Sequence, residues 1–183
     1  MLYLASASPR RVQLLKEAGI VFRAIRTGYR EKDSSRLTPS LLVKKHALGK
    51  ALAVAGKIRN GKILAADTVV YFGGKIIGKP LNRQAAVKTL LLLQGRWHTV
   101  YTAVAFFEMK NGRVFGRRSL VEKTKVLLKK MDEKDIRRYF HHVSPFDKAG
   151  SYAIQAKGES IVRKVNGSFS NAVGLPMERL RFL

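Results

Sequence analysis

A segment near the start of the chain combines small hydroxyl residues with paired arginines and could bind phosphate. The segment Leu4–Arg11 (LASASPRR) joins an apolar stretch to a proline that suits the first turn of a helix. The N-terminus of such a helix presents free backbone N–H groups at the positive end of its dipole. Ser6 and Ser8 add hydroxyl donors, and Arg10 and Arg11 add forked donors that match phosphate oxygens. An ordinary helix cap with two surface arginines is the alternative, and the segment alone favours neither.

A second candidate is the carboxylate of Asp67, which follows the apolar stretch Ile63–Ala66 and precedes Thr68. We expect Ile63–Ala66 to be a buried strand that ends at Asp67, where open α/β sheets place their ligands. The carboxylate could there bind a divalent metal or take a proton from water. An aspartate that only caps the turn after the strand is the alternative.

Four further side chains carry weaker signals. Lys79 lies in Gly78–Pro80, where a stiffened chain could hold the ammonium as a point charge for phosphate, although a plain hairpin exit is the simpler interpretation. Glu31 belongs to a polar loop and Lys50 to a long helix, where solvated charges are ordinary. Gln155 could read the edge of a base through its amide, or it could be a buried structural amide.

The elements that must position these residues are helices and strands, which alternate along the first half of the chain. Hairpins dominate the second half. The periodicity and turn signals predict strands at Leu2–Leu4, Ile20–Ile25, Ile63–Ala66, Val69–Phe72, Lys75–Ile77, Trp97–Phe107, Val114–Leu128 and Ile161–Val165, and helices at 9–18, 39–56, 82–93, 132–140 and from Pro176 onward. This order favours an α/β fold with a mixed sheet. The length of 183 residues, without repeats or linkers, predicts one domain over residues 1–183.

Composition narrows the class of protein. Hydrophobic residues make up 46% of the chain, which is enough for a substantial core. The absence of cysteine excludes a disulfide scaffold, a thiolate zinc site and a cysteine nucleophile, and the four histidines lack metal-ligand spacing. We find no targeting signal and no apolar run that could span a bilayer, so we expect a soluble cytoplasmic protein.

The formal net charge is +24, from 36 Lys and Arg against 12 Asp and Glu. Such a charge attracts polyanions, so nucleic-acid binding and electrostatic steering of nucleotides are both open. The basic residues are spread along the chain in short pairs rather than gathered in a tail.

Together these segments resemble the Maf family of nucleoside triphosphate pyrophosphatases, in order and over nearly the whole chain. The matching motifs are Leu4–Arg11, Ala66–Val70, Gly78–Pro80, His98–Thr102, Asp147–Gly150, Ile154–Gln155 and Asn171–Pro176. The resemblance implies a single Maf/ITPase-like domain, with a mixed twisted sheet flanked by helices and a cleft between two lobes. It also implies hydrolysis of a nucleoside triphosphate to the monophosphate and pyrophosphate with Mg²⁺ or Mn²⁺.

The resemblance assigns roles to individual residues. By this resemblance Asp67 is the catalytic base or a metal-binding carboxylate. The family's other polar active-site residues correspond to Glu31, Lys50 and Lys79, which are further catalytic candidates. Asp67 and Glu31 are the candidates for binding the metal. Substrate-binding positions are Ser6, Ser8, Arg10, Arg11, Thr68 and Gln155. Among these, Arg10, Thr68 and Gln155 resemble the branch that hydrolyses dTTP and UTP.

The family pattern also suggests a homodimer and a link either to arrest of septum formation or to removal of modified nucleotides. Ala156 departs from the pattern, because the family usually has glycine there, and a glycine needed for close approach would make Ala156 narrow the pocket. A basic nucleic-acid-binding protein or a septum-regulating protein on the same fold is the alternative function.

Overall fold

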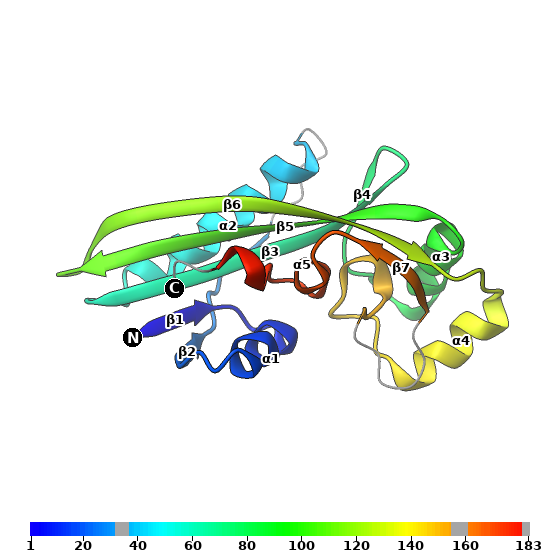
Figure 1. Cartoon of the computed structure of the whole chain (residues 1–183), viewed down its shortest axis with the longest axis horizontal. Coiled ribbons are helices and arrows are strands. Elements are labelled where there is room, and N and C mark those ends of the chain that lie inside the picture. The colour runs from blue at the N-terminus through cyan, green and yellow to red at the C-terminus, as the bar shows by residue number, and fades with distance from the viewer. Residues whose placement is uncertain (32–36, 155–160, 181–183) are drawn as a thin grey trace.

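The computed structural model describes residues 1–31, 37–154 and 161–180, and its centre is one mixed sheet (Figure 1). The strands are β1 (Leu2–Ala5), β2 (Phe22–Ile25), β3 (Gly61–Phe72), β4 (Lys75–Ile77), β5 (Trp97–Lys110), β6 (Arg113–Leu128) and β7 (Val162–Asn166). Their order is β2-β1-β3-β5-β6-β7, with β4 paired to β3. β1 runs parallel to β2 and β3, and the other pairs are antiparallel. The expected α/β class and mixed sheet are confirmed.

Helices cover both faces of the sheet. They are α1 (Pro9–Glu17), α2 (Pro39–Ala55), α3 (Arg83–Leu93), α4 (Glu133–His142) and α5 (Phe169–Val173), with short 3₁₀ turns η1 (Ala149–Ser151) and η2 (Met177–Arg179). None of the helices in the described chain has the length and apolar character needed to cross a membrane.

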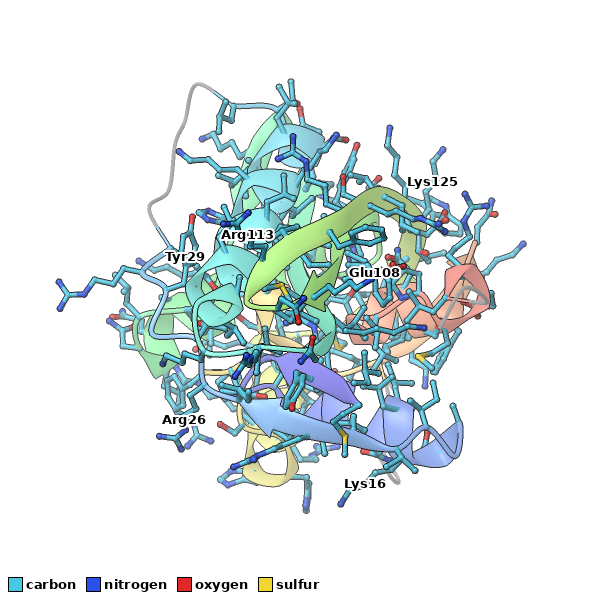
Figure 2. All side chains as sticks on the ribbon, turned by 90° about the vertical axis from the view of Figure 1, so that its left-hand side faces the viewer. Lys16, Arg26, Tyr29, Glu108, Arg113 and Lys125 are labelled. Atoms are coloured by element: carbon cyan, nitrogen blue, oxygen red, sulfur yellow. The ribbon has the colours of Figure 1, made fainter. Side chains whose placement is uncertain are left out.

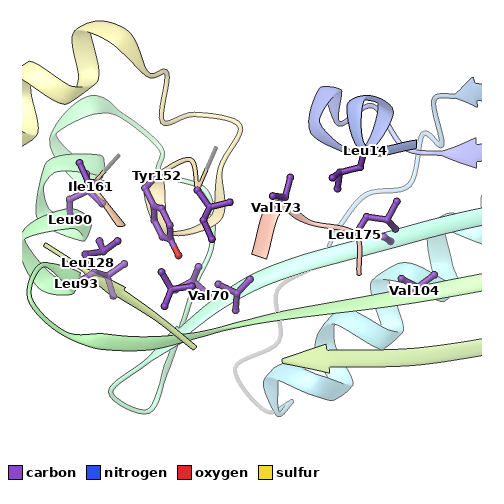
Figure 3. Packing of buried hydrophobic residues seen from close by; sticks show 14 of the residues in the cluster. Leu14, Val70, Leu90, Leu93, Val104, Leu128, Tyr152, Ile161, Val173 and Leu175 are labelled. Carbon is purple, nitrogen blue, oxygen red and sulfur yellow. The ribbon is translucent and has the colours of Figure 1, made fainter. Parts of the chain in front are cut away.

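Two hydrophobic cores lie on opposite faces, because successive side chains of a strand point to opposite sides. On one face Ala47 and Ala51 of α2 pack on a group that includes Ala65 and Phe107. The other core gathers residues of α1, α3, α4 and α5, and Figure 3 shows Leu14, Leu90, Val104 and Val173 among them.

Helix starts follow local chemistry. The Thr38 hydroxyl accepts from the Leu41 N–H, the Asn82 side chain accepts from the Ala85 N–H, and Asp132 forms a capping box with Asp135. Ser8 occupies the N-cap position of α1 but makes no side-chain capping bond in the described chain. Its backbone N–H instead donates to the Ser6 hydroxyl at 3.1 Å.

The expected end of a strand at Asp67 is wrong. Ile63–Ala66 and Val69–Phe72 belong to the single strand β3, because β5 pairs with it without a break, with Thr68 opposite Thr102. Two other expectations also differ. The described residues after Pro176, 177–180, form only the 3₁₀ turn η2 where a helix was expected, and the helix α5 was not predicted.

The outer edge of β3 nevertheless contains a gap at the same place. β5 covers one edge from Gly61 to Tyr71. On the other edge β1 pairs only as far as Ala65, and β4 begins at Val70. Within the described residues, positions 66–69 therefore have no neighbouring strand on this edge. Asp67 lies just past the carboxyl end of β1, where ligands of such sheets are commonly bound.

Candidate active site

A lysine between two carboxylates forms the most concentrated charge cluster at the gap. The Lys50 ammonium, carried by α2, lies 2.6 Å from Oδ1 of Asp67 and 2.6 Å from Oε1 of Glu31. The side chains of Asp67 and Lys50 are 8% and 11% exposed, whereas that of Glu31 is 39% exposed. Lys50 also donates to the Ala66 carbonyl at 3.4 Å. Two carboxylates thus share one buried cation, an arrangement that sets both side chains in place.

Glu31 remains ionised in this setting. Partial burial raises the pKa of its carboxyl, but the charge of Lys50 and the hydrogen bond to it, helped by Lys79 and His46, hold that pKa below its usual value. Because Lys79 and His46 act on Glu31 electrostatically, they belong to the same neighbourhood.

The loop that carries Glu31 is anchored on α2 two residues earlier. The Tyr29 hydroxyl lies 3.2 Å from Nδ1 of His46, and the two rings meet edge to face. The Tyr29 ring packs directly over Gly49, where an added Cβ would lie 2.3 Å from the ring. His46 and Lys50 are four residues apart and so share one face of the helix. Tyr29 and His46 were missed by the sequence reasoning, although this spacing was visible in it.

Arg11 lies on the other side of the gap and is buried. Its guanidinium donates to the Gly174 carbonyl at 2.8 Å, the Ser6 hydroxyl at 3.2 Å and the Thr68 hydroxyl at 3.0 Å. Three of its five N–H groups are thus used within the protein, and they join the loop after β1, the strand β3 and the turn after α5. Arg11 therefore supports the wall of the site as well as contributing charge to it.

Arg10 faces the rim of the same region. Its guanidinium donates to the Asp147 carboxylate at 2.6 Å and to the Asp147 carbonyl at 3.0 Å. Burial raises the pKa of Asp147, but bonding to Lys148 and the charges of Arg10 and Lys148 hold it below its usual value. The sequence placed Asp147 in a motif but did not single it out as a partner of Arg10.

These groups surround one cleft of about 1220 Å³. That volume exceeds the range of roughly 300–1,000 Å³ typical of small-molecule pockets, so a nucleotide can enter. The cleft brings together nine of the residues expected at the site, namely Ser6, Ser8, Arg10, Arg11, Glu31, Lys50, Asp67, Thr68 and Lys79. Gln155 and Ala156 lie outside the described residues.

The donor set suits a hard cation that arrives with a substrate. Among the described residues no group of three His, Asp or Glu side chains could hold a metal ion by itself. Asp67 and Glu31 do offer two converging carboxylates, and Mg²⁺ is commonly held by one or two carboxylates together with substrate phosphates and water.

Comparison with known proteins supplies the family. The family model described as "Maf-like protein" matches residues 1–183. The chain belongs to the Maf family. A relative from Pelotomaculum thermopropionicum named dTTP/UTP pyrophosphatase is 42% identical to this Maf chain, over 97% of this chain and 91% of its own length. Relatives of the same name from Gloeobacter violaceus and Carboxydothermus hydrogenoformans are each 44% identical over 98% of this chain, and over 92% and 94% of their own lengths.

Two solved structures show a distant likeness to this Maf chain. The Ham1 protein of Staphylococcus aureus aligns with a TM-score of 0.47 at 13% identity, covering 87% of this chain and 91% of that one. A nucleoside-triphosphatase (dITP/XTP pyrophosphatase) from Mycobacterium abscessus aligns with a TM-score of 0.41 at 11% identity, covering 69% of this chain and 73% of that one.

Proposed function

We propose that this Maf-family chain hydrolyses dTTP and UTP to the monophosphate and pyrophosphate. The observation that carries the proposal is the Lys50–Asp67–Glu31 cluster inside a cleft large enough for a nucleotide. Relatives at 42–44% identity, matched over 91–94% of their own lengths and each named dTTP/UTP pyrophosphatase, support this choice of substrate.

The reaction joins a water oxygen to the α-phosphorus and breaks the bond to the pyrophosphate leaving group. Asp67 accepts a proton from that water, while Lys50 fixes the carboxylate through its other oxygen. Asp67 and Glu31 would hold Mg²⁺ or Mn²⁺, which when bound neutralises the triphosphate and makes water more acidic. Lys79, Arg10 and the N-terminus of α1, with Ser6 and Ser8, supply further positive potential for phosphate oxygens.

The proposal is tested with a panel of canonical and modified nucleoside triphosphates, scored for pyrophosphate release in the presence of Mg²⁺ or Mn²⁺. We expect dTTP and UTP to be the best substrates. Release of single phosphates, or turnover of none of the panel, contradicts the proposal.

Asp67→Asn is the sharpest variant for the catalytic assignment. It keeps the shape of the side chain but removes its charge, so we expect turnover to fall by about 10³-fold while the protein stays folded. The control is Asp132→Asn, because asparagine caps the start of α4 as well as aspartate does. Turnover of Asp67→Asn at the normal rate rules out Asp67 as the base.

The homodimer, the cytoplasmic location, the role in septum arrest or nucleotide cleansing, and weak binding to nucleic acid stay predictions from the sequence.

A further inference from the structure

A tyrosine and a buried histidine line the cleft beside the carboxylate cluster, and the proposed reaction leaves their hydrogen-bonding groups unused. His46 lies one helical turn before Lys50, on the face of α2 that lines the cleft. Tyr29 also lines the cleft and is half-buried, whereas His46 is 2% exposed. Burial, and then the charges of Asp67 and Glu31, raise the pKa of Tyr29. The phenol is therefore within electrostatic reach of both carboxylates.

The Tyr29 hydroxyl is held against α2. Its oxygen lies 3.2 Å from Nδ1 of His46, and a Cβ added to Gly49 would lie 2.9 Å from the same oxygen. The other ring nitrogen of His46, Nε2, is buried and has no hydrogen-bond partner among the described residues. A buried polar atom without a partner costs free energy, so the placement of the ring proton matters.

The single proton of a neutral histidine ring can be on either nitrogen, and only one choice lets both available protons be used. With the proton on Nε2, Tyr29 gives its own proton to Nδ1, and the buried N–H finds no acceptor in the described part of the chain. With the proton on Nδ1, the ring donates to the Tyr29 oxygen, and only a lone pair stays unpaired. Because buried N–H groups without an acceptor are the rarer defect in folded proteins, the second arrangement is favoured. The phenol proton is then free for a bond in the cleft.

We propose that Tyr29 is a further substrate-binding residue, whose hydroxyl donates to a phosphate oxygen of the nucleotide, and that His46 is the positioning residue that keeps this proton available. The inference rests on the proposed function and adds a donor to its phosphate site. His46 acts only through Tyr29, because its remaining nitrogen is buried.

The phosphates are the part of the nucleotide that meets Tyr29. In the proposed reaction Asp67 takes a proton from the water that attacks the α-phosphorus, so the phosphates lie beside Asp67 and Glu31. Phosphate oxygens accept and do not donate, which matches a phenol that offers its remaining proton, and such charge-assisted bonds are stronger than bonds between neutral groups. Lys50 on this wall is already shared by two carboxylates. A neutral donor therefore adds a phosphate contact that Lys50 alone does not supply.

The first test is Tyr29→Phe, which removes the hydroxyl and keeps the ring over Gly49. We expect KM for dTTP to rise by about tenfold with kcat within about twofold, because a bond made equally to substrate and transition state changes KM alone. The dissociation constant of inorganic pyrophosphate, measured by calorimetry, should rise by about the same factor, and that of uridine, which has no phosphate, should not change.

Two controls separate this contact from a structural role of Tyr29. The Mn²⁺ concentration for half-maximal turnover should be the same in Tyr29→Phe and the wild type, since the ring still anchors the loop that carries Glu31. Tyr101→Phe should behave like the wild type in every measurement. Tyr101 is another half-buried tyrosine and is not among the described residues that line the cleft.

The second test reads the tautomer of His46 from the ¹⁵N chemical shifts of its ring at pH 8. His46→Asn identifies the signals of this residue among the four histidines of the chain. We expect Nδ1 to be protonated and Nε2 to be unprotonated. His46→Asn keeps an N–H donor near the position of Nδ1 and should retain the wild-type KM. His46→Leu has no such donor and should raise KM toward the value of Tyr29→Phe.

The outcomes separate this inference from the proposed function. A wild type that hydrolyses neither dTTP nor UTP refutes the function, whereas pyrophosphate binding and the ring shifts are measured without turnover. Unchanged pyrophosphate binding in Tyr29→Phe, or weaker binding of uridine instead, overturns the phosphate contact. A proton on Nε2 of His46 in the wild type overturns the role of His46, as does a His46→Asn variant that behaves like His46→Leu.

Discussion

Lys50 is the residue on which the carboxylate cluster depends. Its ammonium is the shared partner of Asp67 and Glu31 and is nearly buried. Two carboxylates brought together without a cation repel each other, and the desolvated Asp67 would lose its partner. The same residue therefore serves stability and the proposed chemistry.

We predict that Lys50→Met lowers turnover by at least about 10²-fold and destabilises the fold by about 3 kcal/mol, because removing one member of a buried pair leaves the other charge uncompensated. Steady-state hydrolysis of dTTP and urea unfolding measure the two effects. Lys45→Met is the matched control, since Lys45 is exposed on the same helix. Equal behaviour of the two variants would contradict the role assigned to Lys50.

Among the elements, α2 does most to shape the site. It supplies Lys50, packs against β3 and β5 through small residues, and anchors the Glu31 loop through the contact of Tyr29 with Gly49. Glycine inside a helix is normally unfavourable by about 1 kcal/mol relative to alanine. At position 49 the ring of Tyr29 occupies the space that a side chain would need.

We predict that Gly49→Ala weakens metal-dependent activity despite the better helix propensity of alanine. The new Cβ would displace the Tyr29 ring, and Glu31 would lose its place beside Lys50. The concentration of Mn²⁺ for half-maximal turnover should therefore rise severalfold. Gly56→Ala is the control, because Gly56 ends the same helix with no atom within 4 Å of an added Cβ. An unchanged Mn²⁺ requirement in Gly49→Ala would show that Tyr29 does not position Glu31.

At the scale of the whole molecule, a buried histidine links the middle of the sheet to the C-terminal half. Nε2 of His98 lies 2.7 Å from the Tyr152 hydroxyl. Burial lowers the pKa of His98 to about 4, so its ring is neutral at physiological pH and can accept the Tyr152 proton. Burial also raises the pKa of Tyr152, which therefore keeps that proton.

This histidine should make the stability of the fold depend on pH. Between pH 6.5, the ordinary pKa of histidine, and about pH 4, His98 is protonated in the unfolded chain but neutral in the folded chain. The free energy of unfolding therefore keeps the full contribution of this group above pH 6.5 and loses it progressively toward pH 4. The loss from this group is roughly 3 kcal/mol over that range. Thermal unfolding at pH 7 and pH 5 should show a smaller drop for His98→Gln than for the wild type. The control variant His141→Gln, at an exposed position, should lose as much thermal stability between pH 7 and pH 5 as the wild type. An equal loss in all three proteins would exclude His98 as the source of the pH dependence.

The charge of +24 also acts at this scale, because basic side chains from several elements cover the surface; Lys16, Arg26, Arg113 and Lys125 are labelled in Figure 2. We predict weak binding to DNA oligonucleotides that falls steeply between about 50 and 200 mM salt, since it rests on counterion release. Fluorescence anisotropy measures it. Tight binding that survives high salt would instead favour the nucleic-acid-binding alternative.

The sequence by itself determined the features that depend on neighbouring residues. Helix starts at Thr38, Asn82 and Asp132 were predicted correctly, because a cap is satisfied within one turn. The neighbouring strands at Val69–Phe72 and Lys75–Ile77 were also predicted, and they pair with each other as part of β3 and as β4. Residue types with distinctive chemistry, such as Arg10, Arg11 and Asp67, could be selected in the same way, and their order along the chain indicated the family.

Only the tertiary structure decided how these residues are used. The gap in the β3 edge depends on where β1 stops and β4 begins, and the uninterrupted strand through Asp67 depends on its partner β5. Arg11 reaches a carbonyl 163 positions away, and Lys50 joins a carboxylate 17 positions away. The opening segment, which alone favoured neither a phosphate site nor a simple cap, became part of a cleft wall through these distant bonds. Periodicity and caps report local geometry, whereas hydrogen-bond partners are assigned when remote segments pack together.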